Sequence, residues 1–323
     1  MLYKDAGVDI DKANEFVKYI KDKVGENIGL FGGLFEINEL LKKYNEPVLV
    51  SSCDGVGTKV EIARKLKKYK NIGIDLVAIN VNDVYVMKAK PLFFLDYYAM
   101  HYLDLDISKE LIDGIIEGCN YAECKLIGGE TAQMPAIFKK NKFDIAGFVV
   151  AIAEKSKIPR KEKLEIGDII IGISSNGFHS NGYSLIRKII NQKGIKLNRI
   201  YEEVSENETI GEILLRTTRI YKEILDIDFK SAVHITGGGF YENIKRVLRE
   251  DLDARIKINY EIPRVFKFFM EMGNVSIEEA FRVWNMGIGM VLILDEKVLD
   301  NIKIEYVLLG RIEKGNGRVC VDF

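Results

Sequence analysis

The stretch SSCDGVGTK, which ends at Lys59, combines an acid, two glycines, a hydroxyl and a basic side chain. Asp54 follows the apolar run PVLV, which is typical of a strand, and Gly55 and Gly57 would let a ligand approach the backbone. A carboxylate at a strand end suits Mg²⁺ that bridges to phosphate oxygens, with Thr58 and Lys59 adding a hydroxyl and a charge. The spacing does not fit a Walker A loop, which needs four residues between its glycines. A helix cap is the alternative role for Asp54, because Asp accepts hydrogen bonds from the first amides of a helix.

Three further carboxylates occupy positions that suggest the same chemistry. Asp83 lies in VAINVNDVYV, among apolar residues where an unpaired carboxylate is costly. Glu130 and Thr131 directly follow a glycine pair in IGGETAQMP, at a predicted strand end, and Asp144 begins the next predicted strand. The acids are too scattered for an EF-hand, and they favour a Mg²⁺–nucleotide site built from several elements. A buried hydrogen-bond network is the alternative for Asp83.

Two glycine-rich turns in the second half of the chain each carry a histidine. SSNGFHSNGYSLIRK contains His179 before a predicted helix, and HITGGGFYEN repeats the strand, turn and helix plan with His234. Free amides at a helix N-terminus bind anions such as phosphate, and a nearby histidine can polarise a group or transfer a proton. Ser180 or Asn181 is the predicted N-cap. A capped turn with a surface histidine is the alternative, and His101, among aromatic residues, is expected to be a packing residue.

The bulk composition excludes several classes of function. Of the 323 residues, 47% are hydrophobic and 29% charged, and the net charge of −1 gives no global attraction to nucleic acid or a membrane surface. No apolar signal-peptide core begins the chain, and no stretch is long and apolar enough to span a membrane. Four cysteines without zinc-like spacing are expected to be reduced thiols in a cytoplasmic protein. Neither a Ser-His-Asp order nor a Rossmann glycine motif occurs.

The predicted elements place these motifs at strand ends and helix starts. Apolar spacing predicts a helix after Asp9 and Asp11, followed by a glycine-rich segment, 25–37, that is either a mobile lid or a tethered loop. In the first half we predict strands at 46–52, 91–103, 124–131 and 143–154, with helices at 59–70, 73–90 and 108–122. In the second half we predict a strand at 168–175 and helices at 183–194, 209–225 and 263–273, with further strands toward the C-terminus.

Strands and helices mix in both halves without the strict alternation of a doubly wound sheet. This pattern predicts an α+β fold, with mixed layers in which helices cover one face of a sheet. The chain length favours two domains. The charged segment 154–167, which contains Pro159, is the predicted joint, with an ordinary surface loop as the alternative. We therefore expect an N-terminal domain at 1–155 and a C-terminal domain at 164–323.

As a set, the motifs resemble those of the aminoimidazole ribonucleotide synthetase (phosphoribosylformylglycinamidine cyclo-ligase) family of purine biosynthesis. The resemblance runs in family order across nearly the whole chain. It rests on eight stretches: YKDAGVDI, DGVGTK, GIDLVAINVNDV, PLFFLDYYA, IGGETAQMP, SSNGFHSNGYSLIRK, HITGGGFYENI and NMGIGM. One such motif would be weak, whereas eight in order are highly specific. The resemblance implies two α/β domains and a homodimer in which strands of both N-terminal domains form a β-barrel.

The resemblance also implies a reaction, in which ATP and formylglycinamidine ribonucleotide give ADP, phosphate and aminoimidazole ribonucleotide. It implies ATP and Mg²⁺ as cofactors and does not decide whether a monovalent cation is also needed. Segment 25–35 resembles the family's mobile segment that covers ATP. The implied Mg²⁺ ligands are Asp54, Asp83 and Glu130. The implied nucleotide contacts add Gly55, Gly57, Thr58 and Thr131, and the implied substrate contacts are Asn176, Gly177, Ser180, Asn181, Thr236, Gly237 and Gly238. Lys59 would neutralise phosphate, and His179 and His234 would polarise the amide or move protons.

Three positions depart from the family pattern. Cys53 stands where Thr is common, Gln133 replaces a common Glu, and Met286 stands where Cys is usual, so no catalytic thiol is expected there. Selenophosphate synthetase, a rival of the same fold, would show a reactive cysteine in a glycine-rich N-terminal segment. Thiamine monophosphate kinase lacks this pairing of the two histidine motifs. A non-catalytic nucleotide-binding module would leave the acids and both loops idle, and an ATP turnover assay would identify it.

Overall fold

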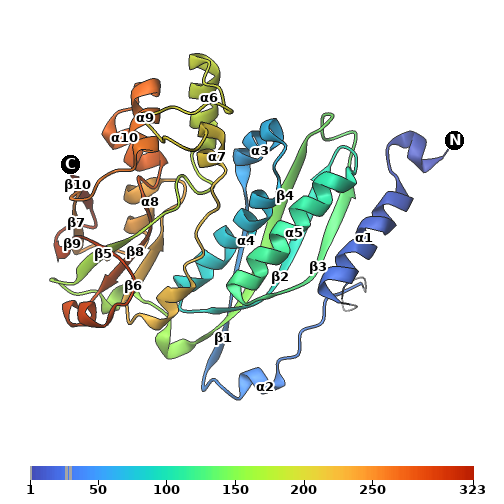
Figure 1. Cartoon of the computed structure of the whole chain (residues 1–323). Coiled ribbons are helices and arrows are strands. Elements are labelled where there is room, and N and C mark those ends of the chain that lie inside the picture. The colour runs from blue at the N-terminus through green and yellow to red at the C-terminus, as the bar shows by residue number, and fades with distance from the viewer. Residues whose placement is uncertain (1, 26–27, 29–30) are drawn as a thin grey trace. The chain divides into compact units, whose positions relative to one another are not determined.

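A computed structural model describes residues 2–25, 28 and 31–323 of the chain. The chain divides into two compact units, one comprising Met1–Val84 and Ala89–Ser156, the other Tyr85–Lys88 and Lys157–Phe323. Each unit contains a sheet with helices packed on it (Figure 1). The predicted α+β class is therefore confirmed.

The first unit is built on a four-stranded sheet in the order β1-β4-β2-β3. The strands are β1 (Pro47–Gly55), β2 (Lys90–Met100), β3 (Lys125–Gln133) and β4 (Phe143–Glu154). β2 and β3 run parallel, and α5 (Leu105–Ala122) is the crossover helix between them. Because β4 pairs antiparallel with both β1 and β2, one row of residues crosses the whole sheet, namely Asp54, Gly147, Asp96 and Gly129.

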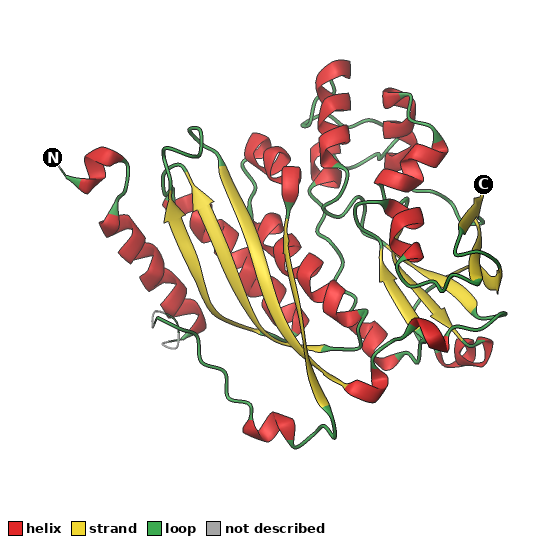
Figure 2. Ribbon diagram, turned by 180° about the vertical axis from the view of Figure 1, so that it is seen from behind, coloured by secondary structure: helices red, strands yellow, loops and turns green. Residues whose placement is uncertain are grey.

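Helices cover one face of this sheet (Figure 1). α4 (Lys70–Tyr85) and α5 pack there over alternate strand residues such as Phe94 and Tyr98, which are fully or almost fully buried. The opposite face carries Leu49, Tyr97 and Phe148, which are 63%, 43% and 37% exposed. Within the described ranges of this unit, no helix lies over that opposite face (Figure 2). We call it the uncovered face of the sheet.

Helices precede and follow β1 along the chain. α1 (Ile10–Val24) begins where predicted, because the Asp9 side chain accepts a hydrogen bond from the amide of Lys12 at 3.2 Å. η2 (Gly57–Lys59) and α3 (Val60–Leu66) follow β1, and α2 (Asn38–Leu41) precedes it. α3 is shorter than the predicted helix 59–70 because Lys67 adopts a left-handed conformation, with φ 54°, and ends it.

The second unit has a six-stranded sheet in the order β10-β7-β9-β5-β8-β6. Its strands are β5 (Ile169–Ser174), β6 (Ser231–His234), β7 (Leu252–Lys257), β8 (Ile288–Leu294), β9 (Val307–Lys314) and β10 (Val319–Asp322). β8 is buried along its whole length, as its unbroken apolar sequence predicts for a strand covered on both faces. The helices are α6 (Tyr183–Lys193), α8 (Gly239–Lys245), α9 (Arg264–Gly273) and α10 (Ile277–Val283).

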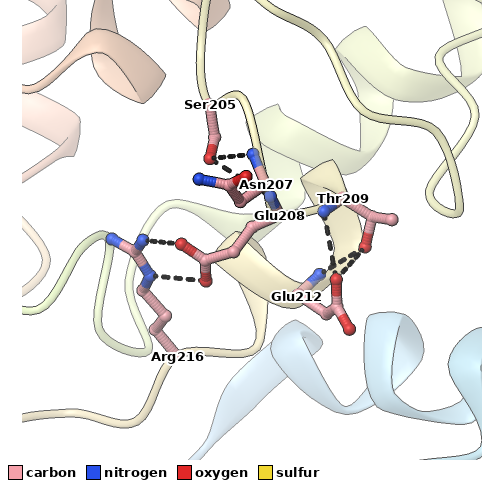
Figure 3. Close-up of polar contacts among 6 residues, drawn as sticks. All are labelled: Ser205, Asn207, Glu208, Thr209, Glu212 and Arg216. Carbon is pink, nitrogen blue, oxygen red and sulfur yellow. Dashed lines mark hydrogen bonds and ion pairs between the residues drawn. The ribbon is translucent and has the colours of Figure 1, made fainter.

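The predicted helix 209–225 is wrong. α7 spans only Ile210–Leu214, and residues 215–221 are irregular before the short helix η5 (Lys222–Asp226). α7 begins at a capping box between Thr209 and Glu212, and Glu208 pairs with Arg216 just beyond the helix end (Figure 3). The apolar spacing that continues beyond Leu214 therefore does not extend the helix.

Candidate active site

Asp54 lies exposed at the end of β1, and its Oδ1 accepts a hydrogen bond from the amide of Gly55 at 2.7 Å. The N-caps of η2 and α3 are Val56 and Lys59, and no side chain makes a capping hydrogen bond at either. Asp54 is therefore not the N-cap residue of either helix. Gly57 has φ 60°, a left-handed conformation that glycine adopts without strain and that turns the chain after β1 into η2.

α4 brings a second carboxylate close to this turn. Asn80 donates to the carbonyl of Asp54 at 3.2 Å, and Asp83, three residues later on the same helix face, accepts from the hydroxyl of Ser52 at 3.2 Å. Ser52 and Asp54 are two residues apart on β1 and share one side of the sheet. The structure thus places Asp54 and Asp83 together, on the helix-covered side of the end of β1.

Lys59 has different surroundings from those expected of a phosphate ligand. Its side chain is fully buried, and its Nζ lies 2.7 Å from Oδ2 of Asp75 on α4, which is also fully buried. Burial lowers the pKa of Lys59, and the charge of Asp75 opposes that shift. The ion pair fixes the end of the DGVGTK loop to α4. A direct contact between Lys59 and phosphate stays a prediction.

Glu130 and Thr131 lie within β3, not at its end, because the strand continues to Gln133. In the ladder, Glu130 is opposite Tyr97 on the uncovered face, and two strands separate β3 from β1. At roughly 5 Å per strand, Glu130 is on the order of 14 Å from Asp54 within one chain. Among the described residues, no group of three or more His, Cys, Asp or Glu side chains could hold a metal ion. Mg²⁺ nevertheless commonly takes one or two carboxylates plus phosphates and waters, which Asp54 and Asp83 fit.

Asp96, which the sequence reasoning missed, lines a cavity of about 540 Å³ in the first unit. Burial raises the pKa of Asp96 to about 7. A Cβ at Gly129 would lie 2.3 Å from Oδ1 of Asp96, so glycine leaves the room that the carboxyl group occupies. The acid in the middle of the aromatic strand PLFFLDYYA was the signal for this residue. Among the other lining residues are Ala13, Val17 and Ile20 of α1, Gly128 to Thr131 of β3, and Ile28, Phe31, Gly32 and Gly33.

The last four of these residues belong to the glycine-rich segment that was expected to be a lid. Residues 26–27 and 29–30 of that segment lie outside the described residues. The lid therefore stays a prediction.

In the second unit, His179 and His234 lie close together. Both are buried, with exposures of 1% and 6%, and their ring centroids are 6.5 Å apart. The surface-histidine alternative is therefore wrong. His179 adopts a left-handed conformation, with φ 57°, and its Nε2 accepts from the amide of Asn176 at 3.4 Å. Such strained backbone is uncommon outside glycine and is typical of functional positions.

The two glycine turns, which we call the histidine loop (residues 175–181) and the triglycine loop (residues 236–239), are neighbours. The N-cap of α6 is Gly182, with φ 73° and no side-chain cap, so the predicted capping by Ser180 or Asn181 is wrong. The hydroxyl of Ser180 instead lies 3.2 Å from that of Thr218. Oδ1 of Asn181 accepts from the amide of Gly237 at 3.1 Å and so joins the two loops.

A third segment, residues 215–221, lies against the histidine loop and was missed because it was predicted as helix. Asn176 donates to the carbonyl of Thr217 at 3.3 Å, and the Tyr221 hydroxyl donates to the carbonyl of Ser174 at 2.9 Å. Burial raises the pKa of Tyr221, which keeps this donor protonated. Arg219 also donates to the Ser174 carbonyl, at 3.2 Å. Two consecutive threonines, which are poor helix formers, were the signal against a helix here.

The three departures from the family pattern have definite surroundings. Gln133 makes two bonds to Asp9, accepting from its amide at 3.3 Å and donating to its carbonyl at 3.1 Å, and the second bond needs an amide side chain. Met286 is fully buried, with φ 49°, and its carbonyl accepts from Tyr260. Cys53 is exposed on β1.

Comparison with known proteins identifies the two domains of the chain and then its family. Residues 39–153 match the family described as AIR synthase related protein, N-terminal domain, and residues 165–318 match AIR synthase related protein, C-terminal domain. The chain is 46% identical to the phosphoribosylformylglycinamidine cyclo-ligase of Syntrophus aciditrophicus, over 98% of this chain and 96% of that protein. It is also 46% identical to the enzyme of that name from Caldanaerobacter subterraneus subsp. tengcongensis, over 99% and 100%. The chain belongs to the phosphoribosylformylglycinamidine cyclo-ligase family.

Solved structures share the fold at much lower identity. HypE of E. coli, a hydrogenase maturation protein, superposes with a TM-score of 0.68 at 14% identity, covering 96% of this chain and 93% of that one. Thiamine-monophosphate kinase of Stenotrophomonas maltophilia superposes with a TM-score of 0.64 at 16% identity, covering 86% of each chain. Across the described part of this chain, no helix has the length and apolar character needed to cross a membrane.

Proposed function

We propose that this chain catalyses the ATP-dependent ring closure of formylglycinamidine ribonucleotide to aminoimidazole ribonucleotide, with release of ADP and phosphate. The observation that carries the proposal is the 46% identity to a cyclo-ligase over nearly the whole of both chains. The formyl amide oxygen attacks the γ-phosphorus of ATP and ADP leaves. The amidine nitrogen then attacks the formyl carbon that carries this phosphorylated oxygen. The bond between that carbon and the oxygen breaks, the oxygen leaves as part of phosphate, and the imidazole ring closes.

The first unit would bind ATP. Asp54 and Asp83, together at the end of β1, are the residues that would hold Mg²⁺ against the phosphates. Bound there, the ion would neutralise phosphate charge that the two carboxylates alone would repel. The backbone around Gly55, Gly57 and Thr58 would approach the phosphates closely. The cavity beside α1 has apolar side chains and a glycine backbone that suit a nucleobase, and Asp96, Glu130 and Thr131 also line it.

The uncovered face of the first unit would be the interface of a homodimer. It exposes Leu49, Tyr97 and Phe148, and apolar side chains of this size are stabilised when a second surface excludes water from them. Two such sheets facing each other form a closed β-barrel. Glu130 also projects from this face, so apposition of two copies would bring it close to side chains of the second copy. Its role as a metal ligand rests on that dimer.

The second unit would bind the ribonucleotide. Loop amides would hold its phosphate, with Asn176, Gly177 and Ser180 on one side and Thr236, Gly237 and Gly238 on the other. His179 and His234 would polarise the formyl amide or accept the amidine proton, which catalysis of ring closure requires. We also propose a cytoplasmic location, in keeping with the four cysteines, all of which are free thiols.

A coupled ADP-release assay with formylglycinamidine ribonucleotide, combined with detection of the aminoimidazole product, tests the proposal. ADP release that depends on both substrates and matches product formation one to one would support it. Thiamine monophosphate is the matched alternative substrate, because a kinase for it shares the fold. ADP release with thiamine monophosphate alone, or no release with either compound, would contradict the proposed reaction.

A further inference from the structure

Two buried asparagines, Asn243 on α8 and Asn285 just before β8, bind the backbone of the two substrate loops. We propose that they are positioning residues, which preset the histidine loop and the triglycine loop for the ribonucleotide. The inference rests on the proposed function, because it takes these loops as the substrate site. Neither asparagine has a role in the site described above.

Asn285 fixes the histidine loop. It is 3% exposed, and its Nδ2 donates to the carbonyl of Gly177 at 2.7 Å. Its Oδ1 accepts from the hydroxyl of Ser175 at 3.1 Å and from the amide of Gly287 at 2.9 Å. Gly177 has φ 137°, a conformation that an L-residue rarely adopts. Asn285 therefore anchors the loop at its least ordinary backbone position, two residues before His179.

Asn243 fixes the triglycine loop in the same manner. It is 2% exposed, and its Nδ2 lies within hydrogen-bonding distance of the carbonyls of Thr236, Gly237 and Gly239, at 3.2, 3.2 and 2.8 Å. The carbonyl and the N–H of a trans peptide point in opposite directions. Because the carbonyls of Thr236 and Gly237 point toward Asn243, the amides of Gly237 and Gly238 point away from it.

The first of these amides donates to Asn181 of the histidine loop, at 3.1 Å. Gly237 is thus held from both sides, by Asn243 through its carbonyl and by Asn181 through its N–H. The peptide plane that sets the direction of the Gly238 amide is fixed by the same contacts. The result is a fixed direction for the Gly238 amide, which can donate to an anionic group in the loop that follows His234.

A structural role alone explains the arrangement less well. Burying a primary amide costs free energy unless its hydrogen bonds are made, and an apolar side chain would fill the same space without that requirement. All the carbonyls that the two amide groups bind are main-chain carbonyls of the two loops. Preorganised loops spare a ligand the cost of ordering them, so the effect belongs in substrate binding.

The test measures the KM for the ribonucleotide and the KM for ATP in Asn243→Ala, in Asn285→Ala and in the parent enzyme. We expect the KM for the ribonucleotide to rise about tenfold to a hundredfold in each variant, because loop order is lost before binding. The KM for ATP should stay within about twofold, since ATP binds in the other unit. Asn259→Ala is the matched control, because its amide also donates to a carbonyl, that of Leu308 at 3.0 Å, but outside both loops. Equal changes in both KM values, or none in either, would overturn the inference.

Hydrogen exchange separates this inference from the proposed function. Amides of residues 175–181 and 236–239 should exchange faster in both variants than in the parent or in Asn259→Ala. This readout needs no catalysis, so it applies even if the parent enzyme fails to close the ring. Unchanged exchange in the loops would overturn the positioning role. If an alanine variant does not fold, Asn243→Ser and Asn285→Ser retain a donor and serve in its place.

A double-mutant cycle gives a further check. Asn181→Ala and Asn243→Ala both release Gly237, so their effects on the ribonucleotide KM should be less than multiplicative in the double variant. Strictly multiplicative effects would mean that the two asparagines act independently. That result would contradict the inference that both of them fix the position of Gly237.

Discussion

Asp54 is exposed at a strand end and is not the N-cap residue of η2 or α3, so its replacement by Asn tests the metal role directly. Asp54→Asn should lower ATP turnover about a thousandfold, because it removes a charge where charge neutralisation is the catalysis. The melting temperature should hardly change. ADP release at saturating Mg²⁺, measured beside thermal unfolding, checks both points.

Asp144→Asn is the matched control for Asp54→Asn. Asp144 also lies on an exposed strand end, and its Oδ1 also accepts from the next amide, that of Ile145 at 2.9 Å. The sequence grouped Asp144 with the acids of the metal site, but it lies three residues from Gly147, the ladder partner of Asp54, and so faces the other side of the sheet. Asp144→Asn is therefore expected to leave turnover close to that of the parent. Near-normal turnover by Asp54→Asn would remove the metal role from this residue.

Asp96 makes stability depend on pH in a defined direction. Burial raises its pKa to about 7 from an ordinary value of 3.8. Between these values the folded state holds a proton that the unfolded state has lost, so the free energy of unfolding falls as pH rises from about 4 to about 7. Asp96→Asn should therefore be more stable than the parent at about pH 8, and this advantage should shrink toward about pH 5. Urea unfolding at several pH values would show it, and a difference independent of pH would contradict the assignment.

Among the elements, α4 holds the nucleotide loop through the buried pair of Lys59 and Asp75. Asp75→Asn should destabilise the protein by about 3 to 5 kcal/mol, because it leaves a buried ammonium without its counter-charge. The double variant Lys59→Met, Asp75→Leu should cost much less, since no buried charge remains. Urea unfolding measures both. Equal losses in the single and double variants would mean that packing, not charge, holds this contact.

The triglycine loop makes a second prediction about an element. Gly239 has φ 58°, and a Cβ there would lie 1.9 Å from the carbonyl oxygen of Phe281. Gly194, at the end of α6, has a similar φ of 66° but nothing within 4 Å of its Cβ position. Gly194→Ala should cost about 1 kcal/mol, the strain of a left-handed alanine, and Gly239→Ala distinctly more. Similar melting temperatures for the two variants would contradict the steric argument.

The sequence predicted elements best where one local signal decided them. β4 matches its predicted range of 143–154 because the polar residues 139–142 precede it, Glu154 ends it, and the mostly apolar run between them is long enough for a strand. The range 209–225 failed because its apolar spacing fits a helix, while residues 215–221 make tertiary contacts instead, such as the bond from Asn176 to the carbonyl of Thr217. A long-range contact of that kind leaves no periodic trace in the sequence.

The same limit applies to the site. Motifs identified Asp54, Asp83, His179 and His234, and each of the two pairs is close in space. The face on which Glu130 projects depends on strand register, which one residue of shift inverts. The burial of Lys59 depends on Asp75, sixteen residues away in the stretch GIDLVAINVNDV, and nothing in that stretch indicates the pair with Lys59. The spacing of residues in the sequence therefore predicted which chemistry they could perform, but not what surrounds each side chain in the fold.

At the scale of the whole molecule, the uncovered face predicts assembly. We expect a homodimer at micromolar concentration by light scattering. Leu49→Lys, which places a charge on that face, should shift the protein toward monomer and lower its activity. Ile137→Lys is the control, because Ile137 is 71% exposed on the segment between β3 and β4 and does not belong to the face. A monomeric parent, or an equally dimeric Leu49→Lys, would contradict the interface.

The asparagines that hold the substrate loops bond to main-chain atoms, and main-chain atoms are the same whatever side chains the loop carries. The shape of each loop therefore depends little on which side chains the loop carries. A loop side chain that makes no bond to these asparagines can be exchanged while the carbonyls that define the loops stay in place. A protein built in this way can acquire a different substrate by small steps, each of which starts from an already ordered site.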